Sequence, residues 1–410
     1  MQKNYMTYHQ HVFLLLLFIL GSSLLFGINA EAGQCSWIAL IFATPITLLV
    51  VLIYARILKL FPETDLFGII DQIFGKIIGK VLVVLLTWYA LHLSAIVLSN
   101  FTEYISIVAL PETPKVVVMT FLMVVTLYLA RSKPKTLGQW AVISGITVIL
   151  LIGFTLILAI KDIDFNNLLP IMPNGPKRVI IGAGQIFAFP FAESVVFLSI
   201  GNSIKKGESS YKIYVFAIIS GAFILLLVYL RNIVTLGAPM AENSFFSSFN
   251  MARTIQIGDF LSRIEGTISI NFVLAGLTKI TICLICAAKG ISSLFRIEHF
   301  EHMTSPIGLL TISLSAILYK NTLEMFDFLK YYNIYALPFQ IIIPVFIWIT
   351  AERYAKKKKY LYENQKTSTK KKRSLFRDRF FVPSCIHLFF RIQSVEGITM
   401  PASVLGNSLR

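Results

Sequence analysis

The sequence predicts an all-α polytopic membrane protein with about ten transmembrane helices. Of its 410 residues, 56% are hydrophobic and 14% are charged, and the mean hydropathy is +0.73. A soluble domain of ordinary composition is about a quarter charged. Apolar stretches of roughly 20 residues, the length that crosses about 30 Å of hydrocarbon, recur along the chain. Together these observations exclude a soluble globular protein.

The predicted spans follow one another from the N-terminus. The first apolar run, "HVFLLLLFILGSSLLFG", is long and lacks a small-x-small cleavage site, so we expect it to be retained as a span. After the second span, "FPETDLFGIIDQIFGKIIGK" is too short and too charged to cross, and its helical spacing of apolar residues predicts an amphipathic helix at the interface. The spans are predicted at residues 10–30, 37–57, 80–108, 115–131, 137–160, 179–201, 211–236, 265–290, 304–320 and 333–353.

The distribution of Lys and Arg predicts the orientation. These residues are more frequent in the connections on the side of the N-terminus, so we expect both termini to be cytoplasmic. Most of the net charge of +16 lies after residue 351, in runs such as "AKKKKY" and "KKKR". Such runs are typical anchors that contact membrane lipids, and they do not indicate nucleic-acid binding. We expect a transmembrane domain over residues 1–360 and a basic cytoplasmic tail over residues 361–410, whose irregular sequence predicts disorder.

Two of the predicted spans contain helix-weakening residues. Span 1 contains Gly21, Ser22 and Ser23, and span 6 contains "GAGQIFAFP" with Gly184 and Pro190. These are the first spans of two five-helix halves, and interruptions at matching positions indicate a transporter-like substrate site. Glycine and proline free backbone amides and carbonyls that can then bind a ligand. The alternative is that they are ordinary kinks or packing points, which are common in membrane helices.

Four ionisable residues fall within the predicted spans. A charge at the bilayer centre costs at least ~2.5 kcal/mol, so it is expected to face the bundle interior beside a partner. Lys279 lies deepest, and Glu193 follows the proline of span 6. Glu103 could equally well lie at the membrane interface instead of facing a buried partner. His92 could equally well be a packing residue with no functional role.

The sequence offers no catalytic motif. There is no phosphate loop or nucleophile elbow, and "RIEHFEH" does not have the spacing of a zinc-binding helix. The redox-like "CLIC" lies within a predicted span, where cysteines pack as small apolar residues. We therefore expect no enzymatic activity, no cofactor and no metal.

Several segments, in their order, carry a family resemblance. They are "GSSLLF", "SWIAL", "FPETDLFGIIDQIFGKIIGK", "LPETP", "LLPIMPNG", "FAFPFAES", "RNIVTLG", "IGDFLSRIEG" and "GLTK". With them the chain resembles the B subunits of GerA-type spore germinant receptors, which are germination permeases of the amino acid–polyamine–organocation superfamily. The resemblance implies a five-plus-five inverted repeat with broken helices 1 and 6. It also implies a location in the inner membrane of the spore, an A-type subunit and a C-type lipoprotein as partners, and a nutrient ligand. The ligand-binding residues that it implies are Gly21, Ser22, Ser23, Gly184, Gln185, Phe187, Ala188 and Phe189.

Two questions stay open at this stage. In related sodium-coupled transporters a cation lies between spans 1 and 8, so the Lys279 ammonium could replace it and bond carbonyls near Ser22 and Ser23. Alternatively, Lys279 forms a structural ion pair with Glu193 or Glu103. The function is either that of a receptor subunit that binds a small neutral amino acid and triggers germination, or that of an amino acid transporter coupled to protons through Glu193 or Lys279.

Overall fold

The computed structural model describes residues 5–26, 29, 31–173, 175–255 and 265–380. In this part of the chain the regular elements are helices. Eight helical stretches are long and apolar enough to cross a membrane; they are Tyr8–Phe26, Gly33–Leu60, Lys76–Val108, Pro134–Asp162, Pro176–Ser203, Ser210–Leu236, Glu265–Phe295 and Thr322–Leu361. The shorter helices α5 (Lys115–Arg131) and α12 (Glu301–Leu318) lie at the two remaining predicted positions. This arrangement confirms an all-helical polytopic protein.

The first half follows the predicted order. It consists of α1 (Tyr8–Phe26), α2 (Ser36–Leu60), α3 (Leu66–Ile73), α4 (Lys76–Val108), α5 (Lys115–Arg131) and α6 (Pro134–Leu158). The predicted end of span 1 falls partly on residues 27, 28 and 30, which lie outside the described residues. α3 is the expected short amphipathic helix, and its N-cap Asp65 accepts a hydrogen bond from the Gly68 amide at 2.9 Å.

The second half begins with an interrupted span. α7 (Pro176–Ile186), the π-turn η4 (Phe187–Phe191) and η5 (Ala192–Ser203) together form span 6. The following elements are α8 (Ser210–Leu236), the short α9 (Ala238–Glu242) and α10 (Ser247–Thr254), α11 (Glu265–Phe295) and α12 (Glu301–Leu318). The last span is α13 (Thr322–Leu337), the π-turn η6 (Pro338–Ile342) and α14 (Ile343–Phe380).

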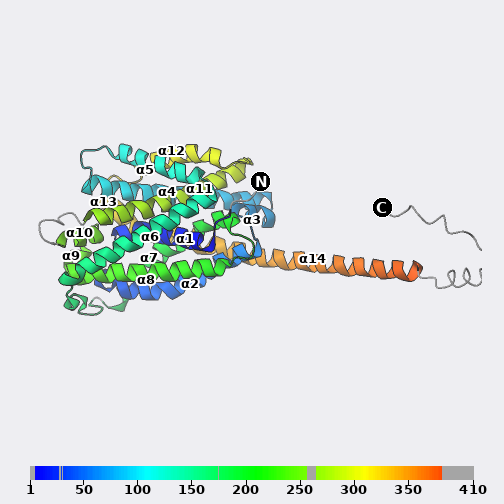
Figure 1. Cartoon of the computed structure of the whole chain (residues 1–410), viewed down its shortest axis with the longest axis horizontal. Coiled ribbons are helices and arrows are strands. Elements are labelled where there is room, and N and C mark those ends of the chain that lie inside the picture. Colours follow the sequence, from blue (N-terminus) through cyan, green and yellow to red (C-terminus); the bar gives the residue numbers. More distant parts are fainter. Residues whose placement is uncertain (1–4, 27–28, 30, 174, 256–264, 381–410) are drawn as a thin grey trace, which may run out of the picture. The chain divides into compact units, whose positions relative to one another are not determined.

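Helix α11 lies in the interior of the bundle. It packs against α4, α1 and α6, while α5 with α12 and α2 with α8 lie on opposite sides (Figure 1). α11 and α4 approach closely at Gly276, because a Cβ there would meet the Phe101 ring at 2.4 Å. Large apolar side chains on the outer helices are exposed, for example Phe121 at 71% and Ile317 at 79%. Exposed apolar faces of this extent fit contact with lipid.

The chain divides into two units, Met1–Glu352 and Arg353–Arg410. Helix α14 continues to Phe380, so residues 361–380 are described as helix where the sequence predicts disorder, and the predicted division at residue 360 stays a prediction. That segment contains neither glycine nor proline and is rich in lysine and arginine, which favour helix. The rest of the predicted tail, residues 381–410, lies outside the described residues.

Candidate functional site

Span 1 is interrupted at Gly21. Its backbone angles (φ −20°, ψ −107°) are not helical, although the residues on both sides are. The side chain of Lys279 on α11 passes directly over this point, because a Cβ on Gly21 would lie 2.8 Å from Lys279 Cδ. The break therefore brings the backbone of α1 against the deepest lysine of the bundle.

Span 6 is interrupted at Phe189 rather than at the glycines. Phe189 has φ −133° and ψ 114°, whereas Gly182 and Gly184 lie inside the regular helix α7. The break therefore lies at the proline end of the predicted interruption "GAGQIFAFP" and not at its glycines. Steric clash with the proline ring disfavours helical angles at the preceding residue, which accounts for the break at Phe189, directly before Pro190. Gly182 instead allows a close contact with Ala32, because a Cβ added to Gly182 would lie 2.6 Å from the Ala32 Cβ.

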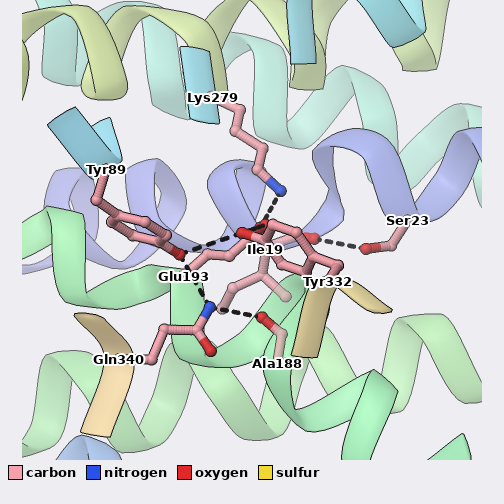
Figure 2. Close-up of polar contacts among 8 residues, drawn as sticks. All are labelled: Ile19, Ser23, Tyr89, Ala188, Glu193, Lys279, Tyr332 and Gln340. Atoms are coloured by element: carbon pink, nitrogen blue, oxygen red, sulfur yellow. Dashed lines mark hydrogen bonds and ion pairs between the residues drawn. The ribbon is translucent and has the colours of Figure 1, made fainter. Parts of the chain in front are cut away.

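A buried ion pair lies between the two breaks. Lys279 donates a hydrogen bond to Glu193 of η5, and both side chains are completely buried (Figure 2). The Lys279 ammonium also lies 5.3 Å from the ring centroid of Phe18 and 4.8 Å from that of Phe189. Within the described part of the chain, its hydrogen bond goes to Glu193 and not to carbonyls near Ser22 or Ser23. The role of the ammonium as a substitute for a cation stays a prediction.

The other predicted ionisable residues lie elsewhere. Glu103 forms an ion pair with Lys115 and accepts a hydrogen bond from Thr322 at 3.2 Å. Of the two carboxylates that the sequence offered as partners of Lys279, Glu193 is therefore the one that pairs with it. His92 bonds the Tyr335 hydroxyl at 2.8 Å through Nδ1 and stacks on Trp88. This environment agrees with the interpretation of His92 as a packing residue.

Three residues that the sequence analysis did not identify complete the network in Figure 2. Tyr332 of α13 donates to Glu193 Oε1 at 2.7 Å, and its hydroxyl lies 3.2 Å from that of Tyr89 on α4. Gln340 of η6 donates to the Tyr89 hydroxyl at 2.9 Å and to the Ala188 carbonyl at 2.8 Å. A glutamine between two prolines in the apolar run "LPFQIIIP" is the sequence signal that could have identified Gln340.

A cavity of about 130 Å³ lies beside this network. One buried water needs about 10–15 Å³ of cavity volume measured in the same way, so the cavity can hold several waters or a small organic molecule. Its lining is mainly aromatic and aliphatic, with four neutral polar side chains and one charge of each sign. The lining residues are Ser23, Phe26, Asn29, Glu31, Gln185, Ile186, Phe189, Tyr229, Phe326, Leu329, Lys330, Tyr332 and Asn333.

Only some of the predicted ligand-binding residues line the cavity. Ser23, Gln185 and Phe189 line the cavity, whereas Gly21 contacts Lys279 and the Ala188 carbonyl is bonded by Gln340. Ser22 and Phe187 are buried away from the lining. An added Cβ on Gly184 would meet no described atom within 4 Å, and Gly184 does not line the cavity. The polar groups of two lining residues have internal partners, since Ser23 donates to the Ile19 carbonyl at 3.1 Å and Gln185 accepts from Asn29 at 3.1 Å.

Two helices broken near a shared cavity and a buried ion pair define a multi-pass membrane protein of transporter-like fold. The structure of MhsT in complex with L-phenylalanine is similar, with a TM-score of 0.61 and 13% identity over 84% of this chain and 89% of that chain. The structure of Mhp1, a nucleobase-cation-symport-1 family transporter, matches with a TM-score of 0.62 and 11% identity over 84% of this chain and 80% of that chain. These likenesses confirm the predicted fold.

The chain belongs to the spore germination protein family, whose sequence profile matches residues 5–324. Spore germination protein KB of Bacillus subtilis (strain 168) is 28% identical over 356 residues, which cover 86% of this chain and 95% of the relative. Spore germination protein A2 of the same organism is 21% identical over 261 residues, covering 63% of this chain and 71% of the relative. The family resemblance inferred from the sequence is therefore confirmed.

Proposed function

We propose that this protein is the membrane subunit of a nutrient-germinant receptor and that it binds a small neutral amino acid in the cavity between the two broken helices. Binding triggers germination through an A-type subunit and a C-type lipoprotein. The protein lies in the inner membrane of the spore with both termini on the cytoplasmic side. Family membership supports the role, and the lysine-rich connections support the orientation.

The observation that carries this proposal is the cavity itself. Its walls come from both interrupted spans, through Ser23 of α1 and Phe189 of η4, and from the last span through Tyr332. The deep charges behind Tyr332 already neutralise each other, because Glu193 is bound by Lys279. The two charges of the lining itself, Glu31 and Lys330, are of opposite sign, so a ligand side chain meets no net charge in the cavity, which favours a neutral amino acid. MhsT, a structure of the same fold, is in complex with L-phenylalanine.

A cavity-filling substitution tests the proposal. Leu329 lines the cavity on α13, so Leu329→Trp is expected to reduce its volume and to lower amino acid-triggered germination at least about tenfold. The matched control is Ile334→Trp on the same helix, because Ile334 is 69% exposed and does not line the cavity. Spores would be tested with L-alanine, L-valine and L-phenylalanine at equal membrane abundance. A normal response of Leu329→Trp would place the ligand elsewhere.

The buried carboxylate gives a second candidate function, proton-coupled amino acid transport. Carboxylates within membrane spans often belong to the proton relays of pumps and transporters. Here Glu193 is reached from the cavity through the single hydroxyl of Tyr332. Uptake of the same amino acids into proteoliposomes with and without a pH gradient tests this. At equal amounts of reconstituted protein, gradient-driven accumulation that Glu193→Gln abolishes supports transport, and binding without accumulation supports the receptor alone.

A further inference from the structure

We infer that Tyr332 couples ligand binding in the cavity to the break in span 6. The ligand part of this inference rests on the proposed function, and the coupling part rests on the hydrogen bonds. Tyr332 is buried, with 2% of its surface exposed, and its ring lines the cavity. It packs edge-on against Phe189, the residue at the break, with ring centroids 6.2 Å apart. One side chain thus contacts both the cavity and the interrupted turn.

The hydrogen bonds around Tyr332 have a fixed direction. A tyrosine hydroxyl carries one proton, and that of Tyr332 goes to the Glu193 carboxylate at 2.7 Å. The proton between the hydroxyls of Tyr89 and Tyr332 must therefore come from Tyr89. The amide of Gln340 has two protons, one for the Tyr89 hydroxyl and one for the Ala188 carbonyl. From Gln340 onward, each donor points toward Glu193, and the charge of Glu193 strengthens the series.

The two ends of this series lie on opposite sides of the break. Ala188 precedes Phe189 and Pro190, and Glu193 follows them. We call the connected set Ala188, Gln340, Tyr89, Tyr332 and Glu193 the clamp. Figure 2 shows that it crosses from η4 through η6, α4 and α13 to η5. The clamp therefore holds the two sides of the interrupted turn through side chains of other spans.

Tyr332 is the member of the described clamp that lines the cavity; Gln340, Tyr89 and Glu193 lie behind it. A ligand that displaces the Tyr332 ring moves its hydroxyl away from Glu193. The carboxylate then keeps Lys279 but loses a donor, and Tyr89 loses its acceptor. Because an unpaired buried polar group is costly, such a displacement favours rearrangement of the break. Only a difference in ligand affinity between the two arrangements can drive this change.

The first test needs no ligand. Tyr332→Phe keeps the ring and removes the hydroxyl, so amide hydrogen exchange in residues 186–194 of the purified full-length protein should rise about tenfold. The matched control is Tyr229→Phe, because Tyr229 also lines the cavity but lies outside the clamp. The inference is overturned if Tyr332→Phe leaves exchange in this segment at the wild-type rate, or if both variants accelerate it equally.

The second test separates binding from response. In membranes of equal protein abundance, Tyr332→Phe should bind labelled L-alanine, L-valine or L-phenylalanine at least as tightly as the wild type, because binding no longer breaks the hydrogen bond to Glu193. The ratio of germination at saturating amino acid to germination without amino acid should fall at least about tenfold, within the usual range of coupling between sites. Equal losses of affinity and response would make Tyr332 a simple ligand contact and overturn the inference. If the wild-type protein binds none of these amino acids, the proposed ligand class fails, and hydrogen exchange alone decides whether the clamp exists.

Discussion

Lys279 shows how a single residue can be fixed in the membrane by its immediate surroundings. Its aliphatic chain packs against Gly21, where a larger residue would not fit. Its ammonium lies close to the Phe18 and Phe189 rings. The charge is compensated by Glu193, which also accepts the Tyr332 proton. Removing one member of a buried ion pair is far more harmful than removing both, because the remaining charge has no partner.

This asymmetry predicts the behaviour of single and double substitutions. Lys279→Met leaves Glu193 unpaired and should destabilise the protein by about 3–5 kcal/mol, seen as low membrane abundance. Adding Glu193→Gln should restore abundance. Adding Glu103→Gln instead should not, because Glu103 pairs with Lys115. A rescue by Glu103→Gln would contradict the observed pairing.

The same double variant distinguishes the two hypotheses for Lys279. If the ion pair is only structural, the Lys279→Met, Glu193→Gln protein should regain nutrient-triggered germination together with its abundance. If abundance returns and germination does not, the ammonium has a further role, as expected for a substitute for a coupling cation. The measurement is the germination rate per unit of receptor in the spore membrane.

At the scale of elements, close helix contacts explain why particular glycines occur in α11. Gly276 lies where α11 meets α4, and an added Cβ would be 2.4 Å from the ring of Phe101. In span 6, by contrast, the helix break occurs at Phe189, and it depends on Pro190 and not on a nearby glycine. In the described part of the chain, Gly182 and Gly276 thus allow close approach of neighbouring elements, whereas Gly21 lies at a helix break.

The close contact at Gly276 can be tested by an alanine substitution, with Gly153 of α6 as the matched control. Gly276→Ala should lower the stability of the detergent-solubilised protein by about 1–3 kcal/mol through overpacking. Gly153→Ala in α6 should be neutral or stabilising, because its added Cβ would meet no described atom within 4 Å and alanine favours helix. Thermal unfolding of both variants measures the difference. Equal unfolding temperatures would show that Phe101 moves aside without cost.

At the scale of the whole molecule, the proposed site lies entirely in unit 1, Met1–Glu352. The compact unit ends at Glu352, and Glu352 forms a bidentate ion pair with Arg56 of α2, with Nε–Oε1 at 2.5 Å and the second contact at 3.2 Å. The cavity and the clamp lie entirely within this unit. Unit 2, Arg353–Arg410, contributes no residue to either in the described part of the chain.

Truncation is therefore expected to be tolerated. A protein that ends at Lys359 keeps unit 1 and the lysine run beside the last span, so its abundance and germination response should be near those of the full chain. Immunoblots of spore membranes and dose–response curves provide the comparison. A truncated protein that inserts but no longer assembles with the A-type subunit would show that residues 360–410 bind a partner.

The sequence by itself determined the class of protein, the order of the spans and the positions of the two interrupted helices to within a few residues. These features depend on local properties: the length of an apolar run, the charge beside it, and the effect of proline or glycine on the backbone. The tertiary structure alone decided which partner Lys279 has, that Tyr332, Tyr89 and Gln340 belong to the site, and that Gly184 does not line the cavity. Lys279 and Glu193 are 86 residues apart, and either of two carboxylates could satisfy its charge. The choice depends on how each helix is rotated and packed within the bundle, which no local pattern specifies.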